Sequence, residues 1–188
     1  LKGDPDVRYD FFDTRVHHKI NDILIRSHDI GLHGSFRSHN SFHYYQKERA
    51  RFRKLDVNII HNRQHFLKFV VPDTWQILED AGMSTDSTIG FSNDWGFRAG
   101  TSYCYPVFNI VRRKCLKLIE YPLIMMDTAL KRKYGTFHDI YEEIKKAYKL
   151  TKRYTGNLVI LWHNNNISHY EWNGSEEFLG KVINEIRK

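Results

Sequence analysis

The sequence predicts an α/β protein built around a parallel sheet. Segments with the 3.6-residue periodicity of amphipathic helices alternate along the chain with short apolar segments. The apolar segments are continuous rather than alternating, which is typical of parallel strands that are buried on both faces. Strands that are separated by helices of this length are joined by crossover connections and therefore run parallel. An open doubly wound sheet and a β/α barrel both fit this pattern.

The first half of the chain is expected to hold three helices and three strands. The first helix is expected from Thr14 to about Ser27, because Asp13 can cap its first turn. A second helix is expected over residues 41–55, with an inner face formed by Phe42, Tyr45, Phe52 and Leu55. Proline near the start and glycine just past the end predict a third helix over residues 72–82. The strands are expected at residues 30–32, 57–60 and 87–91.

The second half of the chain continues the alternation. Two more strands are expected over residues 116–125 and 157–162. A long helix is expected between them over residues 136–153, with Ile140, Ile144, Ala147 and Tyr148 facing inward. A last helix is expected after Ser175 and should pack through Phe178, Leu179, Val182 and Ile186. Since no repeat, low-complexity tract or linker interrupts the chain, the sequence predicts a single domain over residues 1–188.

Composition and charge narrow the classes of protein that fit. Hydrophobic residues make up 41% of the chain and charged residues 27%, as in ordinary globular proteins. The formal net charge of +7 favours anionic partners, but scattered solvated lysines explain it better, because no block of Lys and Arg runs longer than three residues. Cys104 and Cys115 do not form a Cys-x-x-Cys pair, so we expect two buried free thiols rather than a thiolate zinc site. No apolar run could span a membrane, so we expect a cytoplasmic protein, with the cell envelope as the alternative.

Polar side chains collect where the predicted strands end. They are, in chain order, His33, Arg63, His65, Asp86, Arg98 and His163. Because sites in parallel α/β folds lie at the carboxyl ends of the strands, these residues are the candidates for a functional site. Each also has a structural alternative: a histidine can cap a turn or bond a backbone carbonyl, and Arg63 or Arg98 can pair with Asp86 or Glu120.

Several short segments together resemble the polysaccharide deacetylases of carbohydrate esterase family four, in a divergent bacterial branch. Residues 27–36 resemble the family's second motif, and residues 62–66 look like a substitute for its Arg-x-Pro-Tyr motif. Residues 81–88 are similar to a family stretch that ends in Asp-Ser-Ser, and residues 161–163 resemble the terminal Leu-x-His motif. Together with residues 96–101, the order and spacing of these motifs carry the resemblance over most of the chain.

The resemblance implies a fold, a cofactor and roles for individual residues. The family has a distorted (β/α) barrel, expected to have seven strands in the complete protein and to be incomplete at the N-terminus here. A divalent metal, most often zinc, polarises the acetyl carbonyl and activates water in such enzymes. By position, His33 would be a metal ligand and His163 the acid toward the leaving group. Arg63 would orient a carboxylate, with Asp86 and Arg98 nearby in the catalytic set.

Two features depart from the family's pattern. Arg37 stands where the family has its second metal histidine, and an arginine cannot ligate a cation. His39 and His65 are the candidates to replace it, and we favour His65 because it follows a neighbouring strand. The family's Asp-Asp motif is also missing. The resemblance therefore implies that the catalytic base and one metal ligand lie before Leu1.

Three functions stay open at this point. The first is a metal-dependent hydrolase that removes acetyl groups from a polysaccharide or glycan precursor. The second is a catalytically inactive barrel that still binds sugar. The third is a basic nucleic-acid-binding module, which would show steep salt dependence and no metal. Because the chain has no recognised nucleic-acid motif, we expect a glycan rather than a nucleic acid as the partner.

Overall fold

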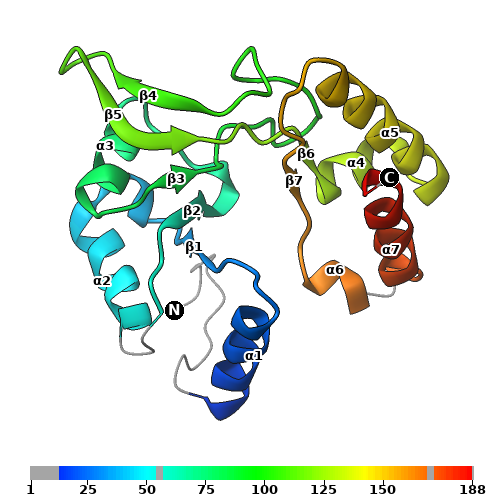
Figure 1. Ribbon diagram of the computed structural model, residues 1–188, viewed down its shortest axis with the longest axis horizontal. Helices are drawn as coiled ribbons and strands as arrows, with labels where there is room; N and C mark the ends of the chain where they lie inside the picture. Colours follow the sequence, from blue (N-terminus) through cyan, green and yellow to red (C-terminus); the bar gives the residue numbers. More distant parts are fainter. Residues whose placement is uncertain (1–12, 54–56, 169–171, 188) are drawn as a thin grey trace. The chain divides into compact units, whose positions relative to one another are not determined.

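The computed structural model describes residues 13–53, 57–168 and 172–187. These residues form seven α-helices and a mostly parallel sheet, which confirms the predicted α/β class (Figure 1). The chain divides into two compact units, each made of two stretches of sequence. We call them the sheet unit (Leu1–Thr88 and Tyr105–Glu120) and the helical unit (Ile89–Cys104 and Tyr121–Lys188).

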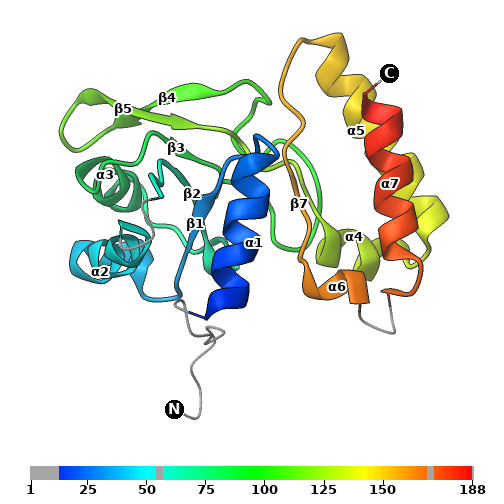
Figure 2. The same ribbon diagram turned by 60° about the horizontal axis from the view of Figure 1, so that its bottom comes forward.

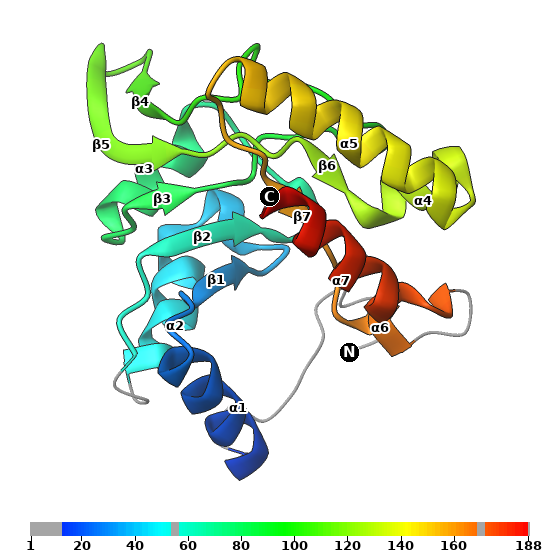
Figure 3. The same cartoon turned by 45° about the vertical axis from the view of Figure 1, so that its right-hand side comes forward.

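The sheet unit contains one sheet with the strand order β1-β2-β3-β5-β4 (Figure 3). Its strands are β1 (Gly31–Gly34), β2 (His61–Gln64), β3 (Thr85–Asp86), β4 (Tyr105–Asn109) and β5 (Lys114–Glu120). Strands β1, β2, β3 and β5 run parallel, and β4 pairs antiparallel with β5 at the edge. Parallel pairing brings the carboxyl ends of β1, β2 and β3 to one edge of the sheet.

Three helices belong to the sheet unit. They are α1 (Thr14–Ile25), α2 (Phe42–Arg53) and α3 (Asp73–Asp80), with two short 3-10 turns, η1 (Ser38–Asn40) and η2 (His65–Leu67). Helices α2 and α3 lie side by side against the sheet (Figures 1 and 3). Tyr45 of α2, Leu78 of α3 and Leu118 of β5 are fully buried there. This packing anchors the strands whose ends carry the candidate residues.

The helical unit has its own core. It contains α4 (Asp127–Tyr134), α5 (Phe137–Arg153), α6 (Asn165–Ser168) and α7 (Ser175–Ile186), together with the parallel pair β6 (Met125–Met126) and β7 (Ile160–Leu161). Helices α5 and α7 lie along each other (Figure 2). The core consists of Ile124, Met125, Leu130, Ile140, Ile144, Ala147, Phe178 and Val182.

Most of the predicted helices are confirmed. The side chain of Asp13 accepts a hydrogen bond from the Arg15 backbone N–H at 2.8 Å and so caps α1 as expected. Thr136 accepts one from the Asp139 N–H and caps α5. In α7, Phe178 and Val182 are buried as predicted. In α2 the prediction for Phe42 was wrong, because its side chain is 44% exposed, and Leu55 lies outside the described residues.

Two strands lie elsewhere than predicted. Strand β2 begins at His61, after the apolar segment 57–60, and β3 occupies Thr85–Asp86 rather than residues 87–91. The ladder residues of β2 are polar because its buried face carries Asn62 and Gln64, which hydrogen-bond to side chains of neighbouring elements. Apolar continuity was therefore a poor guide to strand position here.

The elements that were not predicted are strand β4, helices α4 and α6, and the 3-10 turns η1 and η2. Strand β4 alternates exposed and buried residues, as an edge strand does, and so lacks the continuous apolar run on which the other strand predictions rested. Cys104 and Cys115 are free thiols but exposed, so the prediction that they are buried was wrong. In the part of the chain that the structure describes, no helix is long and apolar enough to cross a bilayer.

Candidate functional site

The sheet unit brings two of the predicted metal ligands together. His33 lies on β1, and its register partner on β2 is Arg63. His65 begins η2, directly after β2. The rings of His33 and His65 have their centroids 5.1 Å apart, with an interplanar angle of 58°. Adjacent parallel strands thus place both imidazoles at one edge of the sheet.

His39, the alternative to His65, lies in a different environment. It is buried in η1, and its Nδ1 is 3.0 Å from the carbonyl oxygen of Phe36. Burial lowers the pKa of His39, with the Phe36 carbonyl opposing that shift and Lys68 adding to it. The structure therefore ties His39 to a backbone carbonyl, whereas the ring of His65 adjoins His33. Arg37, at the position of the family's second ligand, is exposed.

The pair His33 and His65 fits a metal ion in part. Two imidazoles bound to one zinc ion by bonds of about 2 Å have ring centres about 5 Å apart, close to the separation of these two rings. Structural and catalytic zinc sites use three or four protein ligands. Within residues 13–53, 57–168 and 172–187, no group of three or more His, Cys, Asp or Glu side chains is placed to hold an ion. The described residues thus bring two possible ligands together, fewer than a zinc site uses.

Arg63 is held beside the end of β3. Its Nε donates to the backbone oxygen and to the Oγ of Ser87, both at 3.1 Å. Burial lowers the pKa of Arg63, and the carboxyl groups of Asp86 and Glu120 oppose this shift. The guanidinium group is therefore anchored to β3 and lies in the field of two acidic side chains.

Asp86 is fully buried at the centre of a polar network. Its Oδ1 accepts hydrogen bonds from Asn62 Nδ2 and from Thr88 Oγ1, both at 2.7 Å. Asn62 Oδ1 in turn accepts a hydrogen bond from the Tyr45 hydroxyl at 2.8 Å. This chain of hydrogen bonds joins α2, β2 and β3 through side chains alone.

Glu120 is the register partner of Asp86 on β5 and is also fully buried. Trp75 Nε1 donates to Glu120 Oε2 at 3.1 Å. Burial raises the pKa of Asp86, and hydrogen bonds from Thr88, from Asn62 and with Glu120 oppose that shift. Because two buried carboxylates on adjacent strands repel each other, a proton on one of them is favoured.

The helical unit holds the last predicted residue, His163, in a second constellation. His163 follows β7, and Asp127 begins α4 directly after β6. The Nδ1 of His163 is 2.7 Å from Asp127 Oδ1, and the backbone N–H of His163 donates to Asp127 Oδ2 at 2.7 Å. Asn166 Nδ2 donates to the same oxygen at 2.7 Å. With the Thr128 backbone N–H, which donates to Oδ1 at 2.7 Å, four contacts fix this carboxylate in place.

The side chains of Asp127 and His163 differ in their exposure to solvent. The side chain of Asp127 is 0% exposed, whereas that of His163 is 34% exposed. Burial raises the pKa of Asp127, but the hydrogen bonds from His163 and Asn166 outweigh it, so the pKa is lowered overall. An ionised Asp127 keeps the proton of His163 on Nδ1, so Nε2 is the nitrogen that would exchange a proton with a substrate.

Sequence reasoning missed Asp127 and Glu120. Asp127 follows the apolar segment 122–126 in the same way that His163 follows its strand, so the rule that located the other candidates would have found it. Glu120 ends β5 and was considered only as a structural partner for an arginine. Its contact with Asp86 depends on strand pairing between residues far apart in sequence.

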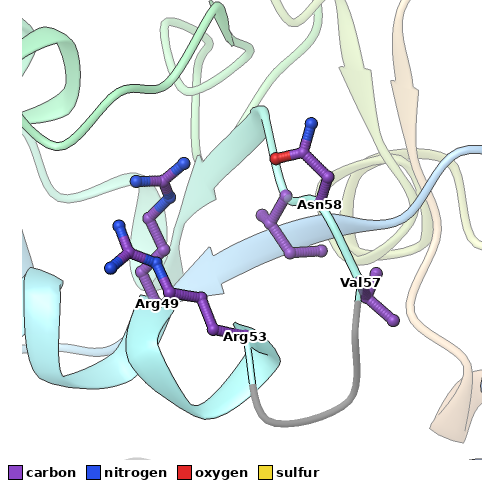
Figure 4. A pocket seen from close by; sticks show the side chains of 5 residues that line it. Arg49, Arg53, Val57 and Asn58 are labelled. Carbon is purple, nitrogen blue, oxygen red and sulfur yellow. The ribbon is translucent and has the colours of Figure 1, made fainter.

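Arg98 and one pocket of the sheet unit involve other residues than these two constellations. Arg98 Nη1 donates to the Gly90 carbonyl at 2.8 Å, within the loop that precedes β4. A pocket of about 280 Å³ in the sheet unit is lined by Arg49, Arg53, Val57, Asn58 and Ile59 (Figure 4). Arg49 Nη2 donates to the Gly82 carbonyl at 3.5 Å just beyond the end of α3, which gives this arginine a structural role. None of the predicted site residues lines this pocket.

In comparisons with known proteins, no protein-family model matches this chain, and no curated protein matches it significantly.

Proposed function

We propose that this chain is a metal-dependent hydrolase that removes acetyl groups from a polysaccharide or a glycan precursor. Its fold would be a distorted (β/α) barrel, and residues 1–188 would form part of a single catalytic domain. A cytoplasmic location suits a precursor glycan as the substrate, and the cell envelope suits a finished polysaccharide. The sequence motifs named above support the proposal.

The observation that carries the proposal is the bond between His163 and Asp127. A half-exposed imidazole that is held by a buried carboxylate is the arrangement of a general acid or base. In amide hydrolysis, water gives a proton to a base and adds to the acetyl carbonyl, and the carbon–nitrogen bond then breaks. Protonated His163 gives the proton from Nε2 to the departing amine nitrogen, and acetate and a free amine result. Asp127 stabilises the imidazolium ion before that transfer.

The sheet unit would supply the metal ligands. His33 and His65 would hold a divalent ion, most simply zinc, which when bound would polarise the acetyl carbonyl and lower the pKa of water. Arg63 would stabilise the negative charge on the adjacent carboxyl groups of Asp86 and Glu120. Arg98 would maintain the loop through its bond to Gly90.

One observation favours the second candidate, an inactive sugar-binding barrel. The described residues offer two metal ligands rather than three. If no further ligand completes the set, the ion would bind weakly or not at all, and only sugar binding would remain. Metal affinity therefore separates the two candidates.

We expect the full-length protein to bind one zinc ion per chain through His33 and His65. A competition titration against a chromophoric chelator measures the affinity. His33→Ala and His65→Ala should each weaken it by about 10- to 100-fold or more, because each removes one ligand. His39→Gln is the matched control, since His39 is bound to a backbone carbonyl, and it should leave the affinity unchanged. Equal zinc affinity in the wild type and both alanine variants would exclude this metal site.

A further inference from the structure

The hairpin formed by β4 and β5 ends in an unusual turn. Asn109 and Lys114 are register partners at the end of the hairpin, so residues 110–113 form the turn. Strand β4 is the edge of the sheet, and the hairpin extends outward at the upper left of Figure 1. No predicted site residue lies on the hairpin, so the proposed hydrolase site does not account for its exposed side chains.

The turn displays large apolar side chains to solvent. Ile110 is 66% exposed and Val111 is 76% exposed, and Phe108 on the outer face of β4 is 50% exposed. A single exposed apolar residue is ordinary in a soluble protein. Three exposed apolar side chains within four residues expose more apolar surface than a single residue does, and exposed apolar surface of this kind can mark an interaction site.

Basic side chains follow the apolar ones directly. Residues 105–119 include Arg112, Arg113, Lys114 and Lys117 but neither Asp nor Glu. The three cations at positions 112–114 are all exposed. The acidic groups near the hairpin are held in other bonds: Glu120 is buried, Glu79 of α3 accepts a hydrogen bond from the Lys117 backbone N–H, and Asp80 accepts one from Gln76. The turn therefore carries three consecutive cations directly after the apolar tip, Ile110 and Val111.

The turn is held in this conformation by a buried side chain. Asn109 is 2% exposed, and its Oδ1 accepts a hydrogen bond from the Arg112 backbone N–H at 2.9 Å. Its Nδ2 donates to Gln76 Oε1 on α3 at 2.9 Å. The tip is therefore presented on a fixed support, which lowers the entropy lost when it binds a partner.

We propose that the β4–β5 hairpin binds the surface of an anionic lipid bilayer. Ile110 and Val111 enter the boundary between headgroups and acyl chains, and Arg112, Arg113 and Lys114 contact lipid phosphates and carboxylates. This combination of a small apolar tip with adjacent cations is the one that binds proteins to membrane surfaces without spanning them.

Two other binding partners fit the hairpin less well: a single-stranded nucleic acid and a second copy of the chain. Single-stranded nucleic acids bind basic surfaces whose aromatic rings stack on the bases, whereas the tip here is aliphatic. A second copy of the chain could add a strand to the edge of the sheet, but Pro106 removes a backbone donor from β4, and such pairing would leave the tip in solvent.

Vesicle co-sedimentation with the full-length protein tests the proposal. We expect binding to vesicles of phosphatidylcholine mixed with phosphatidylserine, and at least about tenfold weaker binding to phosphatidylcholine alone. The double variant Ile110→Ser/Val111→Ser and the double variant Arg112→Gln/Arg113→Gln should each weaken binding to the mixed vesicles about tenfold or more. Because all four side chains are exposed, circular dichroism should show unchanged folding.

Ile25→Ser is the matched control, since Ile25 is an aliphatic residue of α1 that is 81% exposed, and it should bind the vesicles like the wild type. The proposal is overturned if the wild type does not bind the mixed vesicles, or if the Ile110→Ser/Val111→Ser variant binds them equally well. Hairpin-dependent binding of an oligonucleotide or dimerisation through the hairpin, without vesicle binding, would assign the surface to those partners instead. Zinc affinity is independent of this result, so the membrane and hydrolase proposals fail separately.

Discussion

His163→Ala is expected to lower the turnover number for acetyl release by about 10²- to 10⁴-fold, the range that is typical of a general acid or base. Asp127→Asn should cause a loss in the same range, because the amide cannot hold the Nδ1 proton of His163 or stabilise the imidazolium ion. The assay measures acetate released from an N-acetylated chitooligosaccharide by the zinc-loaded, full-length protein.

The double variant His163→Ala/Asp127→Asn tests whether Asp127 acts through His163 or independently of it. If Asp127 acts only through His163, then the variant that carries both changes should be no slower than His163→Ala alone. His138→Ala is the matched control, because His138 is an exposed histidine of α5 in the same unit, and it should keep wild-type turnover. Unchanged turnover in folded His163→Ala would remove this residue from the mechanism.

Glu120→Ala is expected to cost about 2–5 kcal/mol of unfolding free energy, since it leaves a cavity in place of a fully buried side chain. It also leaves the Trp75 N–H without its acceptor. Glu120→Gln should cost less than about 1 kcal/mol, because a side-chain amide can donate to Asp86 as a protonated carboxyl does and still accept from Trp75. Urea denaturation at neutral pH measures both values.

The pH dependence of stability gives the same pair a second test. Because the pKa of Asp86 is raised in the folded protein, the folded chain binds more protons than the unfolded chain above the normal carboxyl pKa of about 4. The free energy of unfolding contributed by this pair should therefore fall as the pH rises from about 4 through the raised pKa. Glu120→Gln should change this dependence. If Glu120→Gln is as destabilising as Glu120→Ala, the carboxyl groups share no proton.

The helices were predictable because their signals are local. The Thr136 cap and the apolar spacing from Ile140 to Ala147 lie within a few turns of each other, and both act in α5 as expected. The strands were harder because their position depends on partners distant in sequence. Asn62 and Gln64 look like loop residues until Asp86 and Ser38 supply their hydrogen-bond partners.

The candidate site was also predictable only in part, because some of its contacts join residues far apart in sequence. His33, Arg63 and His65 were identified from the rule that polar residues follow strands, and the proximity of His33 to His65 depends on the pairing of β1 with β2. Asp127 obeys the same rule, but its significance emerges only from a contact with His163, 36 residues away. The raised pKa of Asp86 depends on burial, which the sequence does not specify.

The central claim is that the protein hydrolyses acetyl groups with the help of a metal ion. Its most direct test is acetate release from an N-acetylated chitooligosaccharide by the full-length protein, with mass spectrometry of the sugar product. The account predicts one free amine for each acetate released, loss of activity after chelation, and recovery when zinc is restored. A folded, zinc-treated protein that binds the sugar but releases no acetate would contradict the claim and identify an inactive sugar-binding barrel.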